Sequence, residues 1–224
     1  MLRDEPPRAR GGVMGMDWTR FVLALVLAYL FGSIPVGYLV IWFTKRQDIR
    51  EHGSGRTGGT NALRTGGRWA GIVTGAGDIL KGFLAVVVAQ WVMQGSPLTI
   101  WAATFGGVAA VLGNNASIFL GFKGGAGTSA NVGACIGMWP LSALWLVPMV
   151  PLGLNLIGYA SLMSIIIAVL IPVTLAIRAA LNLGPWEYVV YGLLTMVLVL
   201  WALRPNIKRL LKGTEPRSPK VDLG

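Results

Sequence analysis

Residues 53–64 combine glycines, hydroxyls, an amide and an arginine in one short stretch, GSGRTGGTNALR. The glycines let backbone N–H groups approach an anion closely, and the polar side chains come just before a run that favours a helix. A phosphate at this helix start would meet N–H donors and a guanidinium. The alternative is a flexible glycine linker between two helices. The phosphate-loop interpretation gives the candidate residues Gly53, Ser54, Gly55, Thr60, Asn61 and Arg64.

A second stretch, GFKGGAGTSAN at residues 121–131, repeats this composition after an apolar span. It is not a Walker A loop, because its lysine precedes the glycines. Two such loops on one side of a membrane suggest one site that holds two phosphates, or one phosphate held from both sides. The alternative is a pair of close-packing glycine turns. The candidate residues of this loop are Lys123, Gly124, Gly125 and Thr128.

Asp78 and Lys81 lie three residues apart in an otherwise apolar run, so they share a helix face and can form an ion pair. Charges at such a depth are costly unless they are paired or face a wet cavity, which makes both supporting site candidates. The alternative is that they reach the interface from near the helix start. With His52 the one histidine and Cys135 the one cysteine, a metal site built from these residue types is excluded.

The composition places these segments in a membrane protein. The 224 residues are 54% hydrophobic and 12% charged, with a mean hydropathy of +0.64. The net charge of +10 comes from basic residues in the loops between apolar spans. In these loops, basic residues are expected to orient the chain in the membrane, to contact anionic lipids and to bind phosphate. We do not expect them to bind nucleic acid.

The apolar runs predict an all-α bundle of about seven transmembrane helices, within a range of five to seven, some of them short or broken by proline. A polar leader, 1–20, precedes the membrane domain, 21–203, and a basic amphipathic tail, 204–224, follows it. The region 131–177 contains four prolines and reads as two normal helices or three short ones. The other expected spans are Phe21–Phe43, Ala70–Val92, Leu98–Leu120 and Trp186–Leu203.

The distribution of basic residues predicts the orientation. The loop 44–69 and the tail are both rich in Lys and Arg, which places them in the cytoplasm. The N-terminus is then outside, and the number of spans is odd, five or seven.

The order of several motifs resembles the PlsY family of bacterial acyltransferases. The resemblance covers residues 22–217 and implies transfer of an acyl chain from acyl phosphate to glycerol 3-phosphate, which gives lysophosphatidic acid and phosphate. It implies seven helices in the cytoplasmic membrane, an active site at the cytoplasmic face and no cofactor or metal. We also expect a monomer that contacts membrane lipids. The matching blocks are FGSIPVGYL (31–39), DIREHGSGRTGGTNALR (48–64), GDILKG (77–82), VLGNNASIFLGFKGGAGTSA (111–130), ASLMSIIIAVLIP (160–172) and NIKRLLKGTE (206–215).

The resemblance also implies roles for individual residues. Arg64 and Lys123 would hold phosphate oxygens, while Ser54 and the loop N–H groups would stabilise charge at the acyl carbonyl. Asn206 matches the C-terminal motif and becomes a further candidate for phosphate binding.

The sequence departs from the family pattern at four positions. Histidines are replaced by Asn114 and Leu203, the second lysine of the second loop by Ala126, and an asparagine of the first loop by Arg56. These changes remove donors for glycerol 3-phosphate or for proton handling. Arg56 and Arg204 supply compensating charge, but neither acts as a base. The alternatives are therefore a relative with another acceptor or without activity. A small-molecule transporter is a further alternative, although the spans offer few polar residues near the midplane.

Overall fold

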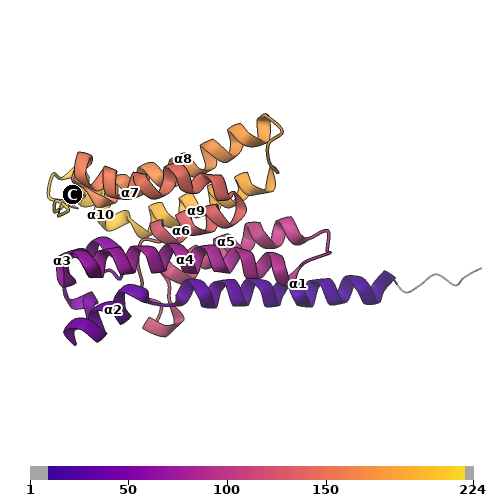
Figure 1. Cartoon of the computed structure of the whole chain (residues 1–224), viewed down its shortest axis with the longest axis horizontal. Coiled ribbons are helices and arrows are strands. Elements are labelled where there is room, and N and C mark those ends of the chain that lie inside the picture. The colour runs from indigo at the N-terminus through magenta and orange to yellow at the C-terminus, as the bar shows by residue number, and fades with distance from the viewer. Residues whose placement is uncertain (1–9, 220–224) are drawn as a thin grey trace, which may run out of the picture.

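The computed structural model describes residues 10–219, and this range is helical with no β-strand (Figure 1). Short 3₁₀ turns at Ile49–Glu51, Ile118–Leu120 and Pro140–Ser142 connect the longer helices. The expected all-α integral membrane class is thus confirmed. The helices are α1 (Arg10–Ser33), α2 (Val36–Lys45), α3 (Gly59–Gly66), α4 (Arg68–Val92), α5 (Thr99–Asn115), α6 (Thr128–Met138), α7 (Ala143–Ile157), α8 (Ala160–Ala180), α9 (Glu187–Ala202) and α10 (Arg204–Leu211).

Five segments of the described chain are long and apolar enough to cross a membrane, or six if the bent pair α9 and α10 counts as one span. This number falls within the expected range. Helix α6 has 11 residues, which rise only about 16 Å, so it cannot cross a bilayer alone. The five segments are Asp17–Lys45, Arg68–Val92, Thr99–Leu120, Pro140–Ile157 and Ala160–Ala180.

The sequence alone suggested one unbroken helix for the first apolar run, Phe21–Phe43. The structure divides this run between two helices. Helix α1 begins at Arg10, inside the predicted leader, and ends at Ser33; α2 begins at Val36. The break coincides with Pro35, which has no N–H to donate. The carbonyl of Ile34 at the break accepts a hydrogen bond from Lys81 Nζ of α4 at 2.7 Å, so a distant helix stabilises the bend.

The proline-rich region 131–177 forms three helices, as one of the two alternatives has it, but α8, with 21 residues, is not short. Pro140 starts the turn that separates α6 from α7, and Gly158, in the left-handed region with φ +75°, ends α7. The other prolines of the region, Pro148, Pro151 and Pro172, lie inside helices.

Helix α4 lies at the centre of the bundle, where it packs against α1, α5 and α6. Two glycines allow its close approach to α6. A Cβ on Gly82 would lie 2.1 Å from the carbonyl oxygen of Ala130, and a Cβ on Gly133 would lie 1.9 Å from that of Ile79. Small residues at such contacts let helix backbones meet in a membrane, where lipid offers no hydrophobic drive for association.

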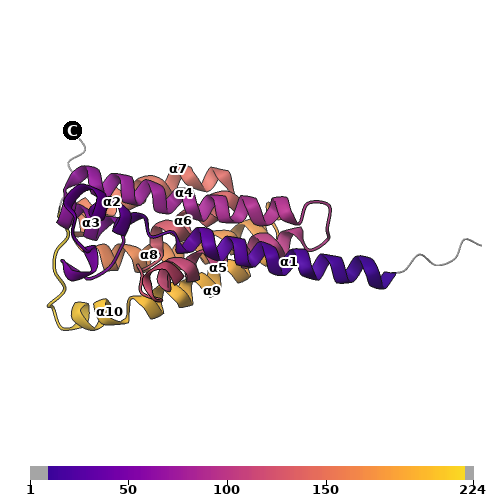
Figure 2. The ribbon, with the colours of Figure 1, turned by 90° about the horizontal axis from the view of Figure 1, so that it is seen from below.

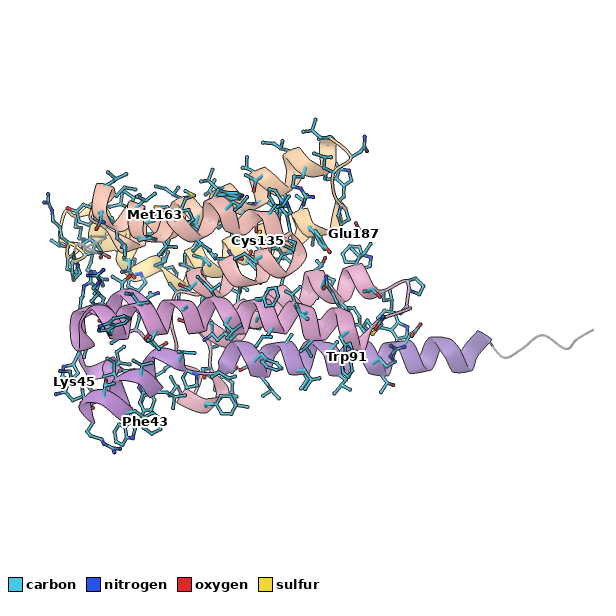
Figure 3. All side chains as sticks on the ribbon, viewed as in Figure 1. Phe43, Lys45, Trp91, Cys135, Met163 and Glu187 are labelled. Carbon is cyan, nitrogen blue, oxygen red and sulfur yellow. The ribbon has the colours of Figure 1, made fainter. Side chains whose placement is uncertain are left out.

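The bundle is elongated and has two distinct ends. Helices α2, α3 and α10 gather at one end, and the α4–α5 and α8–α9 connections lie at the other (Figures 1 and 2). Figure 3 shows Phe43 and Lys45 at the first end and Trp91 and Glu187 at the second. Both glycine loops, the short α3 and the C-terminal segment belong to the first end, which we call the polar end.

Candidate active site

Asn61 organises the first glycine loop. Its side chain is 2% exposed, and its Nδ2 donates to the carbonyls of Ile49, His52 and Arg56 at 3.1, 3.0 and 2.8 Å. Its Oδ1 accepts the backbone N–H of Ser54 at 2.9 Å. Because these bonds occupy both ends of the amide, Asn61 shapes the loop more than it offers a free donor to a ligand.

The glycines of this loop serve the same arrangement. Gly53 and Gly55 have φ of +57° and +71°, which favours glycine. A Cβ on Gly53 would lie 2.2 Å from Asn61 Oδ1, so a larger residue there would displace the amide. These two glycines therefore give the loop its path around Asn61.

The second glycine loop lies against the first. The N–H of Gly125 donates to the carbonyl of Asn114 at 3.0 Å, and a Cβ on Gly125 would lie 3.7 Å from the backbone nitrogen of Gly58. A Cβ on Gly124 would overlap the same Asn114 carbonyl, at 2.1 Å. The two loops thus share one region at the polar end.

A cavity of about 370 Å³ lies between these loops and the helices that follow them. Its polar wall comes from the first loop, α3, the start of α6 and the C-terminal segment. Its apolar wall comes from α4, α7 and α8, whose lining residues include Ile72, Val147, Val150, Leu154, Met163 and Ile167. One cavity therefore joins a charged end to an apolar flank inside the bundle.

Three arginines, Arg56, Arg64 and Arg68, line the cavity and supply it with positive charge. Burial lowers the pKa of both Arg56 and Arg64, yet a guanidinium remains protonated near neutral pH. Arg56 Nη2 donates to the carbonyl of Ala202, and Arg64 Nη2 lies 3.5 and 3.4 Å from the carbonyls of Pro216 and Arg217. Partly desolvated guanidinium groups of this kind bind phosphate oxygens well.

Glu215 places a carboxylate in the same wall. Burial raises its pKa, but hydrogen bonds from Asn206, Ser161 and Arg209 outweigh that effect and hold the pKa below its usual value. The donor distances are 2.8 Å from Asn206 Nδ2, 2.8 Å from Ser161 Oγ and 2.7 Å from Arg209 Nε. The sequence motifs give Glu215 no role, although it is the one carboxylate among the basic residues from Arg204 to Lys220.

Asp78 and Lys81 form the ion pair that their spacing predicts. Asp78 Oδ1 lies 2.8 Å from Lys81 Nζ, and both side chains are 6% exposed. Asp78 also lines the cavity, whereas Lys81 reaches the helix break at Ile34. The pair therefore connects the wall of the cavity with the bend between α1 and α2.

Two polar atoms in the cavity wall have no hydrogen-bond partner within residues 10–219. They are Thr128 Oγ1 and Asn206 Oδ1, and both are buried. Buried polar atoms are nearly always paired, so these two indicate a ligand or water in the cavity.

The structure brings together some of the predicted site residues and leaves others apart. Those that line the cavity are Ser54, Thr60, Asn61, Arg64, Asp78, Thr128 and Asn206. Gly53, Gly55, Gly124 and Gly125 shape its loops without lining it. Lys123 is exposed and outside the lining, although the sequence made it a phosphate ligand.

The four departures from the family pattern all lie in the cavity wall. Arg56, Asn114, Ala126 and Leu203 each line it. Asn114 is 7% and Leu203 is 2% exposed. The differences noted in the sequence are thus concentrated in the site itself.

Known proteins are similar in sequence to this chain over most of its length. Residues 22–213 match the family described as "Glycerol-3-phosphate acyltransferase". The chain is 40% identical over 209 residues to "Glycerol-3-phosphate acyltransferase 3" of Dehalococcoides mccartyi, which covers 88% of this chain and 94% of the relative. It is 42% identical over 195 residues to "Glycerol-3-phosphate acyltransferase 2" of Moorella thermoacetica, covering 87% of this chain and 96% of the relative.

Solved structures have the same fold. The glycerol 3-phosphate form of PlsY (YgiH), an integral membrane glycerol 3-phosphate acyltransferase, matches with a TM-score of 0.77 and 32% identity, over 89% of this chain and 96% of that one. The lysophosphatidic acid form of the same enzyme matches with a TM-score of 0.73 and 29% identity, over 88% and 94% of the two chains. The chain therefore belongs to the family of integral membrane glycerol-3-phosphate acyltransferases.

Proposed function

We propose that this cavity transfers an acyl chain from acyl phosphate to a hydroxyl of glycerol 3-phosphate. The hydroxyl oxygen forms an ester bond with the acyl carbonyl carbon as the bond from that carbon to the phosphate oxygen breaks. The products are lysophosphatidic acid and phosphate, and the hydroxyl proton passes to phosphate or water. A phosphate leaving group needs little protonation, so the step does not depend on a strong general acid.

One observation carries this proposal: a single cavity joins partly buried arginines to an apolar flank between α4, α7 and α8. Both substrates are anionic, and the donor also has a long hydrocarbon chain. The arginine end fits the phosphate groups, and the apolar flank fits the start of the chain. A donor dissolved in the bilayer would enter sideways between helices.

The polar wall suggests individual roles. Arg64 and Arg56 bind phosphate oxygens, while the Ser54 hydroxyl and N–H groups of the first glycine loop stabilise charge that develops on the acyl carbonyl. The unpaired Thr128 hydroxyl and Asn206 amide oxygen lie where an acceptor can bind them. The role of Lys123 as a phosphate ligand stays a prediction of the sequence.

An assay of the purified protein in lipid tests the function. With palmitoyl phosphate and glycerol 3-phosphate, we expect phosphate and lysophosphatidic acid to form in equal amounts. Omission of glycerol 3-phosphate should stop both. Phosphate release that does not depend on the acceptor would show hydrolysis and contradict the proposal.

We also propose that the polar end faces the cytoplasm of a bacterium, across its cytoplasmic membrane. The loop 44–69 and the C-terminal segment are both basic and both lie at this end, which supports that orientation. Glycerol 3-phosphate is charged and soluble in water, and it would reach the site from that side.

Cysteine labelling in intact cells tests the orientation. In a Cys135→Ser background, single cysteines at the exposed positions Glu51 and Lys212 should resist a membrane-impermeant maleimide. A cysteine at Gln94, exposed at the opposite end, is the matched control and should react. Labelling of Glu51→Cys or Lys212→Cys from outside would reverse the orientation.

A second candidate function is transfer to a different acceptor, or loss of activity. The observation that favours it is that Arg56, Asn114, Ala126 and Leu203 all line the cavity. An asparagine has no titratable nitrogen, and a leucine leaves any acceptor oxygen near it unpaired. The guanidinium of Arg56 replaces some of the charge that a lysine would supply, but it does not act as a base.

Restoring the family residues separates the two candidates. We expect Asn114→His with Leu203→His to raise kcat/KM for glycerol 3-phosphate by at least roughly tenfold, because each imidazole adds a donor worth about 1–3 kcal/mol. Asn115→His is the matched control, since Asn115 does not line the cavity, and it should give no gain. Full activity of the unmodified protein with no gain on restoration would show that this chain does not need the histidines.

A further inference from the structure

The last part of the described chain, residues 214–219, forms an extended segment that we call the strap (Figure 2). It runs from the end of α10 to the corner between α7 and α8. Ser218 fixes its far end there. The N–H of Ser218 donates to the carbonyl of Gly158 at 2.8 Å, and its Oγ accepts the N–H of Ala160 at 3.0 Å. Ser218 is 8% exposed, so both bonds are sheltered from water.

These two bonds satisfy groups that the helices leave unpaired. Ala160 is the first residue of α8, and first-turn N–H groups have no partner within their own helix. The residue before it, Tyr159, provides no side-chain cap. Ser218 therefore caps α8 from another part of the chain, in place of the usual capping residue.

The strap also holds two charged groups of the cavity wall. Glu215, at its near end, accepts a hydrogen bond from Ser161 in the first turn of α8. The carbonyls of Pro216 and Arg217, in its middle, face the guanidinium of Arg64 at 3.5 and 3.4 Å. Both Glu215 and Arg64 line the cavity. The position of the strap thus sets the distance between an anion and a cation in the site.

We propose that Ser218 is a positioning residue for acyl transfer: its hydroxyl latches the strap to α8 and so holds Arg64 and Glu215 in the geometry that binds the acceptor. Ser218 itself does not line the cavity, so it acts through these two residues. The inference rests on the proposed function. It adds to it a residue that lies outside every motif of the family resemblance.

Kinetics of Ser218→Ala test the latch. Loss of the hydroxyl leaves the Ala160 N–H unpaired and loosens the strap, which keeps its backbone bond to the Gly158 carbonyl, so we expect KM for glycerol 3-phosphate to rise roughly three- to tenfold. The kcat value should change less, because the acceptor still reaches the same groups at saturation. Ser218→Thr keeps a hydroxyl and should restore KM. Thr214→Ala is the matched control, since that exposed hydroxyl donates to the Arg209 carbonyl of α10, at 3.4 Å, and Thr214 does not line the cavity.

Hydrogen exchange gives a second readout that does not require activity. In Ser218→Ala, the backbone amides of residues 158–162 should exchange faster than in the unmodified protein, and those of Thr214→Ala should not. Unchanged KM and unchanged exchange in Ser218→Ala would overturn the latch, as would an equal rise of KM in Thr214→Ala. If the unmodified protein transfers no acyl chain to glycerol 3-phosphate, the proposed function fails. The exchange measurement then still decides whether Ser218 secures the strap.

Discussion

Lys81→Met should lower the free energy of unfolding by about 3–5 kcal/mol, the usual cost of removing one partner of a buried ion pair. Methionine keeps most of the apolar stem but removes the ammonium group, which lies 2.8 Å from Asp78 Oδ1 and 2.7 Å from the Ile34 carbonyl. The carboxylate of Asp78, 6% exposed, would lose its counter-charge, and the break before α2 would lose its donor. Unfolding in mixed micelles, followed by tryptophan fluorescence, measures the change.

Two further variants show whether the pair is responsible. Lys45→Met removes an exposed lysine at the end of α2 and should stay within about 0.5 kcal/mol of the unmodified protein. Asp78→Asn combined with Lys81→Met removes both charges and should recover part of the loss, because no carboxylate is then left unpaired. A Lys81→Met variant as stable as Lys45→Met would mean that the buried pair adds little to the fold.

The positions of the helices could largely be predicted, because long apolar runs identify them without knowledge of their neighbours. The run 70–92 became α4, Arg68–Val92, within two residues. The break at Pro35 could not be located in this way. Lys81, which donates to the Ile34 carbonyl at the break, lies 47 residues after Ile34 in the sequence. Only the packed structure therefore shows why the bend is tolerated. Pro148 and Pro151 stay inside α7, which shows that proline alone does not end a membrane helix.

The candidate site was partly predictable for a similar reason. The first glycine loop concentrates its polar residues in 12 positions, and Ser54 and Arg64 from it line the cavity. Glu215 was missed because its partner Ser161 is 54 residues away in the sequence. Lys123 was placed in the site by its glycine neighbours, yet the loop turns on the Asn114 carbonyl and leaves the lysine exposed.

Arg64→Ala should lower kcat/KM for glycerol 3-phosphate by roughly ten- to a hundredfold, because one charge-assisted contact with a phosphate is worth about 1.5–3 kcal/mol. Arg64 fits this role because its guanidinium lines the cavity and is partly desolvated. Its contacts with the strap carbonyls involve only Nη2, at 3.5 and 3.4 Å, so the guanidinium keeps other N–H donors for a phosphate oxygen. Arg64→Lys should recover only part of the activity, since an ammonium group does not form the paired contacts of a guanidinium.

Lys123→Ala is the matched control for Arg64→Ala. The two residues carry the same charge and both belong to glycine-rich stretches, but Lys123 is exposed and lies outside the cavity wall. An exposed cation interacts weakly with a distant anion, so we expect less than about a threefold loss of kcat/KM. An equal loss in both variants would return Lys123 to the site and require the second loop to move on substrate binding. Unchanged kinetics in Arg64→Ala would instead remove Arg64 from the phosphate site and leave Arg56 and Arg68 as the arginines that line this cavity.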